Sequence, residues 1–389
     1  MTIGNGGMYA ATVALPLIQA DFGIARSDAS LPYTLTMIGF GLGGIMMGRL
    51  ADRFGVMIPV IGGACFVCAG FIAASFAPNI WTFALIHGVL IGFFGCAATF
   101  APLIADVSQW FTKRRGIAVG IVISGNYVAG AIWPLVLENS FSSVGWRDTY
   151  IGVGIFSVVA MIPLALFLRR PPPMLASGDA AAHSRFVSDR PLGFSPAALQ
   201  AILVLAGIAC CVAMSMPIVH IVAYCGDLGI AAARGAEMLS LMLASGIVSR
   251  LASGWISDQI GALRTLLLGS TLQGIALLLF LPFDGLASLY AVSAMFGLFQ
   301  GGIVPMYAII VRDYFAPSEA GTRVGVVMMA TMLGMALGGW MSGAVFDLTG
   351  SYKAAFLNGS AWNLLNVAIA AWLLYRHTRM YPTSIRSHR

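Results

Sequence analysis

The chain has 389 residues, of which 59% are apolar and only 9% are charged. A soluble globular protein has about 45–50% apolar and about 25% charged residues, so this chain has too few polar residues to coat a surface in water. The composition excludes a water-soluble enzyme. It also excludes a nucleic-acid binder, because the basic residues behind the net charge of +6 are few and scattered between apolar runs. We therefore predict a polytopic protein embedded in a lipid bilayer.

Twelve apolar runs are long enough to cross that bilayer, whose hydrocarbon core needs about 20 apolar residues per helix. We predict membrane spans at residues 1–20, 31–50, 58–76, 81–107, 117–138, 147–168, 197–223, 233–257, 264–282, 286–312, 323–346 and 353–375. The first run has no basic flank and no small-residue cleavage site, so it is interpreted as a span and not as a signal peptide. Its abrupt start leads us to expect a slightly longer natural N-terminus.

The loops between these runs differ in basic charge. Of the 21 Lys and Arg residues, sixteen fall on one side of the membrane and four on the other. The remaining one, Arg250, lies inside a span. Because basic loops remain in the cytoplasm, we predict that both termini are cytoplasmic and that the protein lies in the plasma (inner) membrane. The polar stretch 169–196 is a predicted cytoplasmic linker between two six-helix bundles, 1–168 and 197–389, the second ending in a short cytoplasmic tail.

Internal repeats support this division. The pattern Gly-x-x-x-Asp-x-x-Gly occurs at 48–55 and 254–261, and a third copy at 343–350 lies on the opposite membrane face. A proline recurs in the first helix of each predicted three-helix unit, at Pro16, Pro102, Pro217 and Pro305. Repeats of this kind build secondary transporters, whose substrate site lies at the midplane between them. The expected fold is an all-α membrane protein with twelve transmembrane helices in two pseudo-symmetric bundles.

The stretch GRLADRFG (48–55) resembles the signature of the major facilitator superfamily, and the resemblance extends over the whole chain. The second basic pair that usually follows the signature is replaced here by Val56 and Met57. Other stretches resemble the monocarboxylate transporter and oxalate–formate antiporter branch: WFTKRRGIAVGI (110–121), GWR (145–147), HIVAYCGDLG (220–229) and SRLASGWISDQIG (249–261). This resemblance implies the major facilitator fold and transport by alternating access.

Arg250 is the main candidate for substrate binding, because a charge inside a span is costly and marks a functional path by default. It lies about seven residues, or ~10 Å, from the end of its span. A guanidinium offers a planar fork that matches a carboxylate. Snorkelling to the interface or a structural ion pair are the alternatives. In the branch that the chain resembles, an Arg at this position binds the substrate carboxylate.

Members of that branch often place an acidic residue for proton coupling one turn before this Arg, where this chain has Gly246. His220 is the best substitute because imidazole titrates near neutral pH, and it matches the His of the branch's HIVAY-type stretch. His87 is a weaker candidate, and either histidine could simply be a packing residue.

The remaining candidates are polar residues within spans or at their ends. Substrate could be oriented by Asn126, Tyr127, Tyr307, Tyr9 and Gln300, although each could equally bond a neighbouring helix. Asp52, Arg53 and Asp258 lie at cytoplasmic helix ends beside glycines, where they would stabilise one of two conformations. Cys65 and Cys68 have a metal-like spacing but no second pair or nearby His, so we expect no metal site.

The predicted function is secondary-active transport of a small monocarboxylate together with a proton, with no cofactor and no obligatory protein partner. An anion exchanger of the oxalate–formate type and an efflux carrier for a larger organic acid are the alternatives. A dicarboxylate would favour a second buried cation, and 323–346 contains none past Arg323. A transporter-like receptor is a further alternative, although it would need a signalling domain. No phosphate-binding loop or hydrolase motif is present, so an enzyme is not expected.

Overall fold

The computed structural model describes residues 1–110, 115–169 and 191–381, and within these ranges all regular secondary structure is helical. Helices occupy every predicted span. Among the described residues, ten helical segments are long and apolar enough to cross a membrane. The count of twelve stays a prediction, because the first span consists of two short helices and the last is more polar. Most of the predicted linker, 170–190, and the tail from 382 onward lie outside the described residues.

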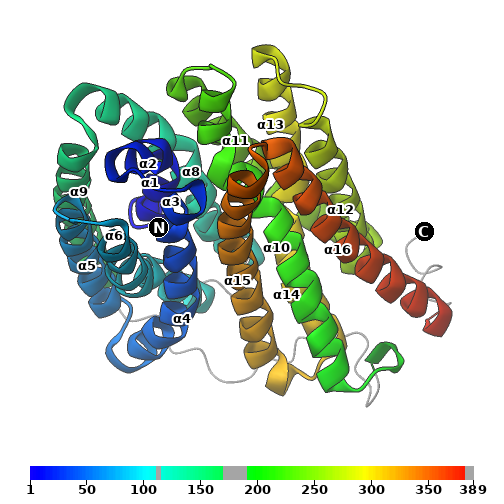
Figure 1. Cartoon of the computed structure of the whole chain (residues 1–389). Coiled ribbons are helices and arrows are strands. Elements are labelled where there is room, and N and C mark those ends of the chain that lie inside the picture. Colours follow the sequence, from blue (N-terminus) through cyan, green and yellow to red (C-terminus); the bar gives the residue numbers. More distant parts are fainter. Residues whose placement is uncertain (111–114, 170–190, 382–389) are drawn as a thin grey trace.

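The N-terminal half contains the shorter and more irregular helices. It consists of α1 (Gly6–Val13), α2 (Leu15–Phe22), α3 (Arg26–Ala29), α4 (Leu31–Phe54), α5 (Met57–Ser75), α6 (Ile80–Ile86), a π-helical segment (His87–Gly95), a 3-10 turn (Cys96–Thr99), α7 (Ala101–Trp110), α8 (Arg115–Val144), α9 (Trp146–Leu166) and a 3-10 turn (Phe167–Arg169). In Figure 1 this half is coloured blue to teal.

The C-terminal half begins with a 3-10 turn (Pro191–Gly193). It continues with α10 (Pro196–Asp227), α11 (Ala232–Ile260), α12 (Ala262–Leu279), α13 (Leu286–Gln300), α14 (Ile303–Tyr314), α15 (Pro317–Thr349) and α16 (Tyr352–Met380). The two halves meet where α8 packs against α11, α4 and α3 against α15, and α1 against α10. Helix α15 therefore stands beside α4, in the centre of the molecule (Figure 1).

Three of the four repeated prolines lie just after a break in their helix. Pro16, Pro102 and Pro305 fall in the first turns of α2, α7 and α14, where a missing backbone N–H costs no helical hydrogen bond. Pro217, by contrast, lies within the continuous helix α10. The recurring proline thus marks an interrupted helix in three of the repeat units.

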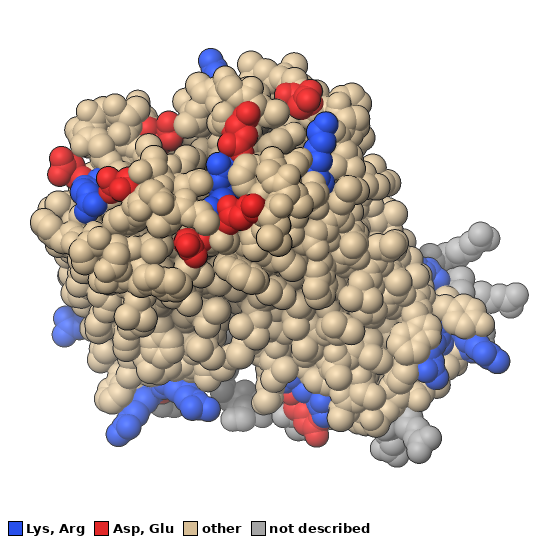
Figure 2. Space-filling view, in the orientation of Figure 1, with Lys and Arg blue, Asp and Glu red and all other residues tan. Residues whose placement is uncertain are grey.

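The two ends of the bundle differ. We call the end where α4 and α11 finish and α10 begins the linker face, and the end where α3 begins and α15 finishes the clasp face. The linker face lies at the bottom of Figure 2, where Lys and Arg gather and a notch separates the halves. On the clasp face, at the top, acidic and basic side chains lie close together.

Candidate functional site

Arg250 lies on α11 where the two halves meet. Its Nε donates a hydrogen bond to the Gly301 carbonyl at 3.3 Å, and its Cζ lies 4.4 Å from the centre of the Tyr127 ring, which belongs to α8 in the other half. Such stacking is a cation–π contact. Among the described residues, no carboxylate forms an ion pair with Arg250. The guanidinium is therefore held in place by neutral groups.

The stacking of Tyr127 on Arg250 depends on Gly246, one turn earlier on α11. A Cβ at position 246 would lie 2.6 Å from Cδ1 of Tyr127, well inside van der Waals contact. The ring of Tyr127 thus occupies the space that a side chain at position 246 would need. Glycine is required here for packing, which explains this departure from the branch pattern.

Tyr9 and Asn126 complete the surroundings of the arginine. The Tyr9 hydroxyl, on α1, donates to the backbone carbonyl of Asn126 at 3.2 Å, and Tyr9 lies within electrostatic reach of Arg250 and Tyr127. The Oδ1 atom of Asn126 is buried and has no described partner. Four predicted residues are thus brought together by α1, α8 and α11.

The other two predicted binding residues differ in their partners. Gln300 immediately precedes Gly301, is fully buried, and has no described partner for either side-chain amide atom. The hydroxyl of Tyr307 donates to Oδ1 of Asn366 at 2.7 Å, and Nδ2 of Asn366 donates to Ser270 Oγ at 2.8 Å. Tyr307 therefore joins α12, α14 and α16 within one half, and its hydroxyl proton is already donated.

The predicted gating residues lie exposed on the linker face. Asp52 and Arg53 are at the end of α4 and Asp258 near the end of α11, and none of them forms an ion pair with a described residue. A Cβ added to Gly48 or Gly254 would meet nothing within 4 Å. Among the described residues, the aspartates of the first two copies of the repeated pattern thus form no ion pair between the halves.

The third copy, 343–350, is engaged on the clasp face. The carboxylate of Asp347 accepts hydrogen bonds from the backbone N–H groups of Arg26, at 2.9 Å, and Ser27, at 2.8 Å. A Cβ on Gly343 would lie 2.9 Å from the Arg26 carbonyl oxygen, so only glycine lets α15 approach α3 this closely. The same pattern therefore joins the halves on one face and is unpaired on the other.

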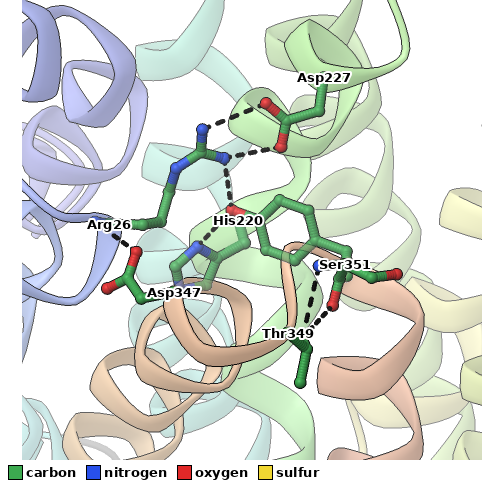
Figure 3. A network of polar contacts seen from close by, with 7 residues as sticks. Arg26, His220, Asp227, Asp347, Thr349 and Ser351 are labelled. Atoms are coloured by element: carbon green, nitrogen blue, oxygen red, sulfur yellow. Dashed lines mark hydrogen bonds and ion pairs between the residues drawn. The ribbon is translucent and has the colours of Figure 1, made fainter.

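The side chain of Arg26 extends this connection. It donates from Nη1 to Asp227 Oδ2 at 2.8 Å and to the Tyr352 hydroxyl at 2.9 Å, and from Nη2 to Asp227 Oδ1 at 3.1 Å. His220, fully buried on α10, lies 2.9 Å from the Tyr352 hydroxyl through Nδ1 and 2.8 Å from the Gly339 carbonyl through Nε2. We call Arg26, His220, Asp227, Asp347 and Tyr352 the clasp; Figure 3 shows its labelled members converging from both halves.

Sequence reasoning identified His220 but missed the other four members of the clasp. Arg26 lies between two predicted spans, and its partners Asp227 and Asp347 are 201 and 321 residues away along the chain. One signal was available, because Asp347 lies in the third copy of the repeated glycine–aspartate pattern.

No group of three or more metal-ligating side chains occurs within the described part of the chain. Cys65 is exposed on α5 and Cys68 is half-buried on the same helix. The polar site around Arg250 consists of guanidinium, phenol and amide groups, which suit an organic anion better than a cation.

A helical membrane protein built from two halves, with a partly buried cation where they meet, has the architecture of a secondary transporter. Residues 2–283 and 203–387 match the Major Facilitator Superfamily, and the chain belongs to this superfamily of membrane transporters, which are not enzymes. Over 339 residues it is 28% identical to monocarboxylate transporter 13 of Bos taurus, covering 86% of this chain and 78% of that protein.

Two further similarities extend this comparison. Over 325 residues the chain is 27% identical to the aspyridones efflux protein apdF of Emericella nidulans, covering 82% of this chain and 63% of that protein. The fold is similar to the crystal structure of a bacterial homologue of the human lysosomal transporter Spinster, in its inward-facing and occupied conformation. The TM-score is 0.66 and the identity 16%, with 99% of this chain and 94% of that chain covered.

Proposed function

We propose that this protein is a secondary-active carrier of small monocarboxylates that works by alternating access and is coupled to protons. The observation that carries the proposal is the position of Arg250 at the interface of the halves, with no described carboxylate paired to it. A single guanidinium suits a single carboxylate. The similarity to monocarboxylate transporter 13 supports the same substrate class.

The neighbours of Arg250 would complete the binding site. Tyr127 orients the guanidinium by stacking, and the unpartnered amide oxygen of Asn126 can accept a hydrogen bond from a substrate hydroxyl. Tyr9 and Gln300 supply further hydroxyl and amide groups, whereas the hydroxyl of Tyr307 stays bonded to Asn366. Sites of this kind use a few placed polar groups within an apolar wall.

Alternating access would use the two faces in turn. In this structure the clasp joins the halves on one face while a notch separates them on the other (Figure 2), so the site would be reached from the linker face. In the opposite conformation, Asp52, Arg53 and Asp258 would pair across the linker face, where Gly48 and Gly254 leave room for close approach. With cytoplasmic termini in the plasma membrane, the present conformation faces the cytoplasm.

The proton would be taken up by His220, because the turn before Arg250 offers Gly246 in place of a carboxylate. The same absence favours anion exchange as a second candidate, since nothing on that turn can carry a proton beside the substrate. Efflux of a larger organic acid is favoured by the similarity to the aspyridones efflux protein.

Uptake into proteoliposomes distinguishes these candidates. Labelled lactate, pyruvate, formate and oxalate are tested with and without an inward proton gradient. Gradient-driven accumulation of a monocarboxylate, lost in Arg250→Ala, is the expected result. The matched control is Arg234→Ala, which removes an exposed arginine of the same helix that pairs with Glu237. Uptake only into vesicles preloaded with an anion would establish exchange instead. No flux of any of the four would contradict the monocarboxylate proposal.

A further inference from the structure

Hydrogen-bond donors and acceptors in the clasp define the protonation state of His220. The Gly339 carbonyl can only accept, so the hydrogen in that bond belongs to Nε2 of His220. In a neutral ring Nδ1 is then an acceptor, and it receives the Tyr352 hydroxyl hydrogen. The Tyr352 oxygen in turn accepts from Nη1 of Arg26. One continuous chain of donors thus runs from Arg26 in one half to Gly339 in the other, and it requires a neutral imidazole.

A proton on Nδ1 would break this chain. The Tyr352 hydroxyl could no longer donate to His220, and its oxygen would face N–H donors from two cationic groups, the imidazolium and Arg26. The like charges would repel each other in a buried position, where charge interactions are poorly screened. Arg26 would then lose its hydrogen bond to Tyr352, which is one of its ties to the C-terminal half.

The acidic groups around His220 are already engaged. The titratable and charged groups that face it are Tyr352 from α16, Asp347 from α15 and Arg26 from α3. Asp227, at the end of the helix that carries His220, pairs with Arg26. Asp347 caps the backbone N–H groups of Arg26 and Ser27, and Asp227 binds the Arg26 guanidinium through both oxygens. Neither carboxylate can neutralise an imidazolium without giving up Arg26. Protonation of His220 therefore weakens the clasp whether the imidazolium stays unpaired or takes a carboxylate from Arg26.

We propose that His220 is a proton-operated switch for access from the clasp face: the neutral ring holds the clasp shut and the protonated ring releases it. This inference deepens the proposed function. It rests on that function only for the direction of transport. The proton would act on access to the site and not on the Arg250 pocket itself. Acid on the clasp side would favour the conformation that opens to that side, and Nδ1 must return its proton before the clasp re-forms.

The test measures the clasp face directly, without substrate. Spin labels are attached to cysteines replacing Ser142, at the end of α8, and Asp284, between α12 and α13, both exposed. Cys65 and Cys68 are changed to serine so that they take no label. Double electron–electron resonance in lipid nanodiscs at pH 8 and pH 5 then reports the distance between the halves. We expect a single short distance at pH 8 and a longer-distance population that grows severalfold at pH 5.

Three variants make the result specific. His220→Gln supplies an amide that does not titrate, and it should abolish the pH response. Tyr352→Phe removes the middle link of the chain and should populate the longer distance at both pH values. His87→Gln is the matched control, because His87 is equally buried but lies among residues of the N-terminal half, and it should keep the wild-type response.

Two results would overturn the inference. One is a wild-type protein whose distances do not change with pH, and the other is a His220→Gln protein that keeps the full pH response. Because the measurement needs no substrate, failure of the monocarboxylate proposal in the uptake assay would leave it unaffected. Conversely, a pH-independent clasp would not affect the assignment of Arg250.

Discussion

Replacing Gly246 with alanine tests whether the contact between Tyr127 and Arg250 prepares the binding site. The new methyl group would lie 2.6 Å from Cδ1 of Tyr127, whereas ordinary contact begins near 3.4 Å. The ring must therefore move by close to one ångström, away from a guanidinium that it now faces at 4.4 Å. A partly desolvated cation–π contact contributes about 1–2 kcal/mol. Its loss predicts about 5- to 30-fold weaker substrate affinity, since 1.4 kcal/mol is a factor of ten.

The assay is the KM of monocarboxylate uptake in proteoliposomes, measured for a double-mutant cycle of Gly246→Ala, Tyr127→Ala and the two together. Once the ring is gone the methyl group has nothing to displace, so the double variant should be no worse than Tyr127→Ala. Gly152→Ala is the matched control, because a methyl group there meets no atom within 4 Å. If the free-energy costs in KM of the two single variants simply add in the double variant, the reasoning is refuted.

Three further substitutions test other parts of the structure. Tyr307→Phe leaves Oδ1 of Asn366 unpaired and should destabilise the protein by about 1–3 kcal/mol in thermal unfolding at unchanged KM; a raised KM with normal stability would place Tyr307 in the binding site instead. Asp258→Asn should lower the maximal uptake rate without changing KM, and an unchanged rate would contradict its gating role. Gly343→Ala should separate α15 from Arg26 and populate the longer clasp-face distance at pH 8, which a wild-type distance would contradict.

The sequence predicted the helical architecture well, because that architecture follows from local composition. Apolar runs of about 20 residues correspond to helices throughout the described chain. Three of the four repeated prolines lie at helix interruptions that the sequence analysis did not predict. Arg250 also stands out in the sequence as a charge within an apolar run, and its role in substrate binding stays a prediction. In the sequence, its neighbour Tyr127 is only one of several polar residues within predicted spans.

The contacts between the halves could not be predicted in the same way. The stacking of Tyr127 on Arg250 depends on the register of α8 against α11, which no periodicity records. The clasp depends on backbone N–H groups at Arg26 and Ser27 that any sequence would offer, so Asp347 reads as one more residue at a helix end. A partner hundreds of residues distant leaves no local pattern to detect.

The central claim is that Arg250 binds the carboxylate of the substrate. The most direct measurement is uptake of labelled lactate and pyruvate into proteoliposomes by wild type, Arg250→Lys, Arg250→Ala and the control Arg234→Ala. The account predicts loss of uptake in Arg250→Ala and a raised KM in Arg250→Lys, which keeps the charge but not the planar fork. It predicts wild-type uptake in Arg234→Ala. An Arg250→Ala protein that folds and transports either anion with wild-type KM would contradict the account.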